Sequence, residues 1–148
     1  MGIKDKNDVN NKLIYKARLT VKGCSQREGY DFEETFSPVA QVSALRLILS
    51  LASNLGMILW QFDVQNAFPN AKLNQFDIYM EAPTIMNLPQ GRYLQLHRAL
   101  YGLKQASREW NLHLVSILKH LGFRQLITEA CIFIARIHNE DIIILICR

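Results

Sequence analysis

An alternating run of apolar side chains at residues 58–64 constrains the fold most, because it delivers an acid to the end of a strand. Its even-numbered residues are apolar, whereas Leu59, Gln61 and Asp63 occupy the other face. This period of two predicts a β-strand that directs Asp63 away from the main apolar face. A carboxylate here, before a polar turn at residues 65–70, can hold a metal ion or form a solvated turn. The pattern alone leaves both interpretations open.

Further strands are predicted where apolar residues alternate or cluster between turn residues. Pro69 prevents the ladder of residues 58–64 from continuing, and the tail has the pattern of a hairpin joined by residues 138–141. The predicted strands are residues 12–22, 58–64, 77–81 and 93–96, followed by the hairpin strands 131–137 and 142–147.

Two helices are predicted from apolar residues at helical spacing. The first covers residues 44–54, with Ser43 as its N-cap and Gly56 just past its end. The second covers residues 107–121, with Ser107 as its cap and Gly122 as its stop. The expected buried faces comprise Leu45, Ile48, Leu49, Leu51 and Ala52 in the first helix, and Trp110, Leu114, Ile117, Leu118 and Leu121 in the second. Strands and helices mixed in this order indicate an α+β fold.

The first predicted strand carries a basic stripe, since Lys12, Lys16, Arg18 and Lys22 share one of its faces. A solvated edge protected by lysines explains this stripe, and so does a surface that faces phosphates. The net charge of +4 is compatible with a polyanionic partner but does not identify one.

Bulk composition is that of one intracellular globular domain. The chain has 148 residues, 49% hydrophobic and 20% charged, so it can form one domain and bury a core. Its three cysteines, Cys24, Cys131 and Cys147, lack the spacing of a zinc site or a disulfide framework. No apolar run is long enough to span a bilayer, and the charged start is unlike a signal peptide. We expect an unanchored, cytoplasmic protein.

Several short motifs occur in one order along nearly the whole chain. Their succession closely resembles the reverse transcriptase domain of copia-type long-terminal-repeat retrotransposons. The motifs are YKARL at residues 15–19 with Lys22-Gly23, QREG at 26–29, ETFSPV at 34–39, Asp63-Val64 with Ala67-Phe68, YME at 79–81 and ALYGLKQA at 99–106.

The resemblance implies one partial domain of a right-handed polymerase, with antiparallel sheet packed on helices. Residues 1–56 would form the fingers side, and residues 57–148 the palm with inserted finger segments. The implied activity is RNA-directed DNA polymerisation with two Mg²⁺ ions, a deoxynucleoside triphosphate and an RNA or DNA template–primer. The rest of the Pol polyprotein is an implied partner, and the intact element would work in the cytoplasm, a virus-like particle or the nucleus.

The resemblance also assigns site residues. Asp63 becomes the first catalytic carboxylate and a metal ligand, and the main-chain carbonyl of Val64 lies near the second cation. Phe68 would be the aromatic gate that excludes a 2′-hydroxyl, although spacing alone favours a core role for it. The remaining implied nucleotide-binding residues are Arg18, Lys16, Lys22, Asn66, Ala67 and Gln105. For Tyr101 and Trp110, we expect packing in the protein rather than stacking on bases.

Departures from the family pattern predict a chain that is inactive alone. The family has a Tyr-x-Asp-Asp turn after a run like residues 142–146, whereas Cys147 and Arg148 follow that run here. The first strand of the finger hairpin is also expected to be absent. Pro69, Ala71, Ser107 and the loop 84–88 differ from the family as well. The alternatives are a residual nucleic-acid-binding module and a non-functional remnant of an element.

Overall fold

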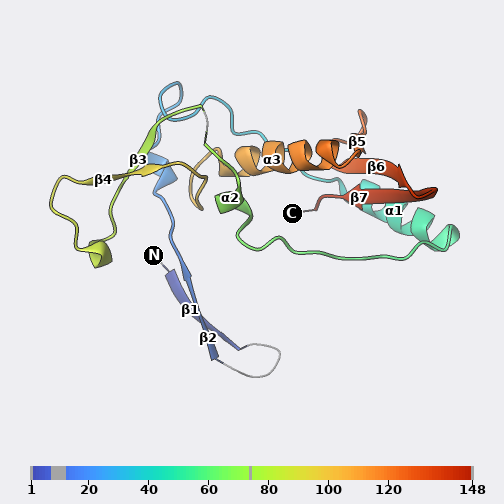
Figure 1. Cartoon of the computed structure of the whole chain (residues 1–148), viewed down its shortest axis with the longest axis horizontal. Helices are drawn as coiled ribbons and strands as arrows, with labels where there is room; N and C mark the ends of the chain where they lie inside the picture. Colours follow the sequence, from blue (N-terminus) through green and yellow to red (C-terminus); the bar gives the residue numbers. More distant parts are fainter. Residues whose placement is uncertain (1, 8–12, 74, 148) are drawn as a thin grey trace. The chain divides into compact units, whose positions relative to one another are not determined.

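The chain divides into two compact units, each built from two separated segments, in a computed structural model that describes residues 2–7, 13–73 and 75–147. Unit 1 comprises Met1–Phe36 and Asn66–Trp110, and unit 2 comprises Ser37–Gln65 and Asn111–Arg148. Side chains are described from residue 17 onward, except at residues 74 and 148. Figure 1 labels the elements of both units. The predicted division into fingers and palm stays a prediction.

Unit 1 begins with a hairpin that the sequence did not predict. Strand β1 (Gly2–Asn7) pairs antiparallel with β2 (Leu13–Arg18), from Gly2 opposite Arg18 to Asn7 opposite Leu13 (Figure 1). The expectation that the first strand of this hairpin is absent was therefore wrong. Strand β1 has too few apolar residues to show an alternating pattern. It still forms, because backbone N–H and C=O groups make the pairing whatever the side chains are.

Strand β2 ends earlier than predicted, at Arg18, and the residues just after it pair with a different segment of unit 1. Thr20 forms an isolated parallel bridge with Tyr101, and the N–H of Val21 donates to the Tyr101 carbonyl at 2.8 Å. The short 3-10 helix η1 (Gly23–Ser25) follows. The region 20–25 is thus held against a segment far along the chain.

The predicted strands at residues 77–81 and 93–96 are confirmed, and they form the second sheet of unit 1. Strands β3 (Ile78–Glu81) and β4 (Tyr93–Leu96) pair antiparallel, and the loop between them contains the 3-10 helix η2 (Thr84–Met86). The turn after residue 64 forms the single helical turn α2 (Ala67–Asn70). The buried core of unit 1 consists of Ala71, Ile78, Ala99, Leu103 and Ala106, against which Val21, Phe68, Leu73, Phe76, Leu96 and Trp110 pack.

Helix α3 (Ala106–His120) confirms the second predicted helix within one residue at each end. Ser107 lies inside its first turn rather than at the N-cap, because the Glu109 N–H already donates to the Gln105 carbonyl at 2.9 Å. Gly122 has φ +88°, which ends the helix in the left-handed region as predicted. Of the expected apolar face, Ile117 and Leu121 are exposed.

Unit 2 contains a three-stranded antiparallel sheet in the order β5-β6-β7. Strands β6 (Ile132–Ile137) and β7 (Glu140–Leu145) confirm the predicted hairpin, and β5 (Arg124–Gln125) was not predicted. The turn has two residues rather than four, since His138 and Asn139 both have positive φ and Ile137 pairs with Glu140. Leu118, Phe123 and Phe133 form the buried core of this unit, with Leu114, Val115, Ala135, Ile144 and Ile146 against it.

Helix α1 (Val42–Asn54), also in unit 2, confirms the first predicted helix but not its cap or its buried face. It begins before Ser43, whose hydroxyl donates to the Gln41 side chain at 3.3 Å. Ala52 is the one buried residue of the helix, whereas Leu45, Leu49 and Leu51 are exposed. Most of the apolar face that we expected to be buried is therefore exposed.

The predicted strand at residues 58–64 was wrong. This stretch has no strand assignment and makes no ladder with any strand in the described part of the chain, and Trp60 and Phe62 are 77% and 84% exposed. Alternation supplies a face to bury, but a strand also needs a neighbour for its backbone groups.

The helices and antiparallel sheets together confirm the α+β class. No helix within the described ranges is both long enough and apolar enough to cross a bilayer.

Candidate nucleotide-binding site

Three segments of unit 1 that are distant in sequence meet around Tyr101. The end of β2 brings Arg18, the helical turn α2 brings Phe68, and the strand-like stretch after β4 brings Tyr101 itself. Backbone hydrogen bonds fix all three segments: Val21 N–H donates to the Tyr101 carbonyl at 2.8 Å, and Ala99 N–H donates to the Ala71 carbonyl at 2.9 Å. The side chains are thus carried by paired backbone rather than by a loose loop.

Arg18 and Phe68 both contact the Tyr101 ring, and we call these three side chains the Arg18–Tyr101–Phe68 cluster. The Arg18 guanidinium carbon lies 5.7 Å from the centre of the Tyr101 ring, a cation–π distance. The Phe68 ring meets the Tyr101 ring edge-on, with centroids 4.8 Å apart and an interplanar angle of 63°. Arg18 remains solvent-exposed, whereas Phe68 and Tyr101 are half-buried. The cluster therefore offers an oriented cation beside two aromatic rings.

Two glycines allow the close backbone approach beneath this cluster. A Cβ on Gly23 would lie 1.9 Å from the Gly102 carbonyl oxygen, and a Cβ on Gly102 would lie 2.1 Å from the Val21 carbonyl oxygen. Gly102 also has φ +94°, a region that favours glycine. Any side chain at either position would push the two segments apart.

Gln105 is buried in this unit, with 4% of its surface exposed. Its amide nitrogen donates to the Asp31 carbonyl at 2.9 Å, and its amide oxygen accepts from the Gln26 amide nitrogen at 3.0 Å. Both ends of the side chain thus contact protein groups. Its predicted contact with a nucleotide stays a prediction.

The other predicted phosphate-binding residues lie in the same unit. Lys22 is exposed at the start of η1, and Asn66 precedes α2 in the left-handed conformation, with φ 51°. Ala67 begins α2. Lys16 is placed by its backbone in β2, but its side chain lies outside the described residues. The roles of these residues stay predictions.

Asp63 and Val64 belong to unit 2 and lie in the exposed stretch 58–64. Among the side chains that the structure describes, no three His, Cys, Asp or Glu residues gather as a metal ion would require. Asp63 by itself does not fit a two-cation site, because two cations need several shared oxygen ligands. Its assignment as a metal ligand stays a prediction.

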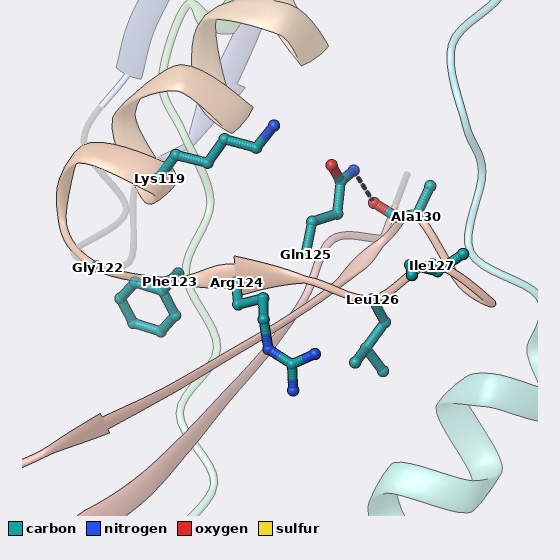
Figure 2. A pocket seen from close by; sticks show the side chains of 8 residues that line it. All are labelled: Lys119, Gly122, Phe123, Arg124, Gln125, Leu126, Ile127 and Ala130. Atoms are coloured by element: carbon teal, nitrogen blue, oxygen red, sulfur yellow. Dashed lines mark hydrogen bonds between the residues drawn. The ribbon is translucent and has the colours of Figure 1, made fainter.

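A cavity of about 630 Å³ lies in unit 2, away from every predicted site residue in sequence. Figure 2 shows its lining, in which the charged ends of Lys119 and Arg124 lie on opposite sides of β5. Among the lining residues, the Gln125 side-chain amide donates to the Ala130 carbonyl at 2.7 Å (Figure 2). The two cations do not converge on one point, so the cavity has no evident anion site.

The sequence predicted that Tyr101 packs, and the structure confirms this through its contact with Phe68, but the sequence did not predict which residues surround it. The motif at residues 99–106 singled out the segment, but no local pattern places an arginine from residue 18 over this ring. Gln26 was missed for the same reason, since its partner Gln105 is 79 residues away.

A family model matches nearly the whole chain. The model describes the reverse transcriptase (RNA-dependent DNA polymerase) family, and it covers residues 2–147. The chain belongs to the reverse transcriptase family.

Curated relatives of this reverse transcriptase chain include Pol polyproteins of copia-type plant transposons and a Gag-Pol polyprotein of a yeast transposon. It is 39% identical over 144 residues, 95% of its length, to the Retrovirus-related Pol polyprotein from transposon TNT 1-94 of Nicotiana tabacum. It is also 39% identical over 122 residues, 81% of its length, to that from transposon RE1 of Arabidopsis thaliana. A Transposon Ty1-H Gag-Pol polyprotein of Saccharomyces cerevisiae is 26% identical over 125 residues.

The reverse transcriptase chain spans only 11% of the tobacco polyprotein and 8% of the Arabidopsis one. No solved structure is significantly similar to it. The predicted family, copia-type reverse transcriptases, is thus confirmed.

Proposed function

We propose that this chain binds a deoxynucleoside triphosphate at the Arg18–Tyr101–Phe68 cluster, and that by itself it does not polymerise. The observation that carries the proposal is the placement of the exposed Arg18 guanidinium over the Tyr101 ring, with Phe68 edge-on beside it. The family supports a nucleotide as the ligand, and the cluster supplies the groups that a nucleotide needs.

Arg18 would bind the triphosphate. A guanidinium presents several N–H donors in a planar fork that matches phosphate oxygens, and the ring beneath it limits the directions in which this fork points. Lys22, exposed nearby in sequence, adds a second positive charge. The backbone N–H groups of Asn66 and Ala67 are proposed to contribute further donors.

Phe68 would lie against the sugar. Its half-buried ring is fixed from one side by Tyr101, so it has little freedom to move aside for an added hydroxyl. An apolar ring at this point leaves a 2′-hydroxyl without a hydrogen-bond partner, which disfavours ribonucleotides. The proposal therefore includes a preference for deoxynucleotides.

The whole polyprotein would use this fragment as part of the fingers and palm of a right-handed polymerase, on an RNA or DNA template–primer in the cytoplasm. Divalent cations, which we propose to be Mg²⁺, would there stabilise charge on the reacting phosphate. Asp63 and the Val64 carbonyl would hold these ions only together with carboxylates from elsewhere. The 148-residue chain is therefore proposed to bind without catalysing.

Fluorescence anisotropy with labelled dTTP tests the binding proposal. Replacing Arg18 by Ala should weaken dTTP binding about tenfold or more, since hydrogen bonds to charged groups contribute about 1.5–3 kcal/mol. Arg92→Ala is the matched control, because Arg92 is also an exposed arginine of unit 1. Equal losses in the two variants, or no dTTP binding by the wild type, would overturn the proposal.

A primer-extension assay tests the second half of the proposal. The chain with a primed RNA template, dNTPs and Mg²⁺ should give no product above background. Product that disappears in Asp63→Ala would show that the chain is catalytic by itself, and the proposed inactivity would be wrong.

Template binding is a separate expectation, based on the exposed cations Arg18 and Lys22. Binding to a nucleic acid should weaken steeply as salt rises and should fall further in Arg18→Ala/Lys22→Ala. Asp63→Ala should bind as the wild type does. Template affinity without dTTP affinity would favour the alternative of a residual nucleic-acid-binding module.

A further inference from the structure

We propose that Arg98 is a positioning residue for the part of the site that would select the sugar of the nucleotide. Its guanidinium holds the end of α2, the helical turn that carries Phe68, and thereby fixes the ring that would exclude a 2′-hydroxyl. This inference rests on the proposed nucleotide-binding function.

The turn α2 needs support from other segments, because it is only four residues long. A single turn fixes several backbone angles for few hydrogen bonds, so it is hardly stable alone. Asn66 enters the turn with φ 51°, in the left-handed region that residues other than glycine seldom adopt. Pro69 has no backbone N–H and therefore cannot donate a hydrogen bond within the turn. The position of Phe68 thus depends on contacts from elsewhere in unit 1.

Arg98 supplies two such contacts at the far end of the turn. Its Nη1 atom donates to the Pro69 carbonyl at 3.2 Å and to the Asn70 carbonyl at 3.3 Å. The last carbonyls of a helix have no donor within the helix, so an outside donor satisfies them. The Asn70 side-chain amide donates in turn to the Asn66 carbonyl at 3.3 Å, which joins the two ends of the turn. Holding the last carbonyls therefore holds the whole turn.

Arg98 can hold the turn because its own backbone is fixed beside it. Lys72 forms an isolated antiparallel bridge with Arg98, and the Ala99 N–H donates to the Ala71 carbonyl at 2.9 Å. Both alanines belong to the buried core of unit 1. This pairing fixes the Arg98 backbone relative to Ala71, the residue that follows α2.

Two separate contacts then define where the Phe68 ring lies. The Tyr101 ring meets it edge-on with centroids 4.8 Å apart, and Arg98 holds the backbone turn that carries it. Without the Arg98 contacts only the ring contact remains, so the turn can shift and the ring can move away from the sugar. Because Arg98 is exposed to solvent, its hydrogen bonds contribute less than buried ones, and we expect a moderate effect on sugar preference.

A competition assay tests this role, with unlabelled dTTP or ribothymidine triphosphate displacing labelled dTTP from the chain. The two competitors differ only in the 2′-hydroxyl, and the ratio of their dissociation constants is the readout. Arg98→Met removes the donors but keeps a long side chain, whereas Arg98→Lys keeps a cation that can donate to both carbonyls. Arg92→Met is the control, because Arg92 is also an exposed arginine of unit 1.

Arg98→Met should lower the preference for dTTP about three- to fivefold, whereas Arg98→Lys and Arg92→Met should stay within about twofold of the wild type. Partial unfolding weakens both competitors by the same factor and leaves the ratio unchanged. A direct contact of Arg98 with the phosphates would do the same, because both competitors carry the same triphosphate. An unchanged ratio in Arg98→Met would therefore overturn the positioning role.

Combined variants test whether Arg98 acts through the Phe68 ring. Phe68→Ala removes the ring and should itself lower the preference for dTTP. Adding Arg98→Met should then lower this preference no further, since both changes affect the same ring. A double variant that shows the product of the two single effects would overturn the route through Phe68.

Hydrogen exchange separates this inference from the function on which it rests. The Ala71 N–H donates to the Phe68 carbonyl at 2.9 Å, so its exchange reports on the end of α2. Arg98→Met should speed this exchange about fivefold, with or without a nucleotide, and Arg92→Met should leave it unchanged. Unchanged exchange in Arg98→Met would overturn the positioning role alone. Wild-type protein that binds no dTTP would overturn the proposed function and this inference together.

Discussion

Residues 26–32 and residues 58–64 differ in the reverse of the way that their apolar patterns predict. The first stretch has no apolar alternation, yet Gln26 and Phe32 are anchored by hydrogen bonds and a cation–π contact. The second has clear alternation, yet Trp60 and Phe62 are largely exposed. Residues 26–32 have hydrogen-bond partners for their backbone and amide groups, whereas residues 58–64 have only an apolar pattern. The partners, and not the apolar pattern, therefore decide which stretch is held in place. Residues 58–64 present a large apolar surface of unit 2 to solvent.

Removing one aromatic ring from each stretch should give the largest contrast. Phe32→Ala should lower the free energy of unfolding by about 3–5 kcal/mol, because it leaves a cavity beneath Lys104. Phe62→Ala should change it by about 0.5 kcal/mol or less, because this ring is 84% exposed. Urea denaturation measures both. Similar losses in the two variants would break the comparison.

Glycine substitutions test the close backbone approach between Val21 and Gly102 in unit 1. Gly102→Ala should cost about 2–4 kcal/mol, since it combines positive φ with a Cβ placed 2.1 Å from the Val21 carbonyl oxygen. Gly91→Ala has the same kind of φ, +83°, but nothing within 4 Å, and should cost only about 1–2 kcal/mol. Thermal or urea unfolding that ranks Gly91→Ala as the more damaging change would contradict the close approach.

The smallest expected effect concerns Glu109, in the first turn of α3. Burial raises the pKa of this carboxyl above its ordinary value of 4.5, and the neighbouring Arg108 partly opposes the shift. Its ionisation therefore costs more in the folded chain, so stability falls as pH rises from about 4.5 through the raised pKa. Glu109→Gln should be slightly more stable than wild type at pH 7, and this advantage should vanish at pH 4. If urea unfolding showed a larger gain in stability for Glu109→Gln at pH 4 than at pH 7, the pKa of Glu109 would be lowered and not raised, which contradicts the prediction.

Elements with local signals were predicted well. Helix α3 has an apolar face and a glycine stop, and strands β6 and β7 flank a polar turn, so neither depends on distant residues. Strand β1 could not be predicted, because its pairing uses backbone groups that every sequence supplies. The prediction of a strand at residues 58–64 was wrong for the opposite reason, since its apolar pattern is strong but no described strand pairs with it.

The candidate site was predicted only in part. The resemblance selected Arg18 and Phe68, and the structure brings both to one ring. It could not select Tyr101 as the contact of Arg18 or Gln26 as the partner of Gln105, because each of these contacts joins segments about 80 residues apart. The roles of all the predicted site residues stay predictions, and these residues are Arg18, Lys16, Lys22, Asp63, Val64, Asn66, Ala67, Phe68 and Gln105.

Intermolecular nuclear Overhauser effects between dTTP and the isotope-labelled 148-residue chain test the central claim most directly. We expect cross-peaks between the C2′ protons of dTTP and the Phe68 ring, with shift changes at the Arg18 guanidinium and the Tyr101 ring. Cross-peaks to Phe123 beside the cavity of Figure 2, without any to Phe68 or Tyr101, would place the nucleotide elsewhere and contradict the account.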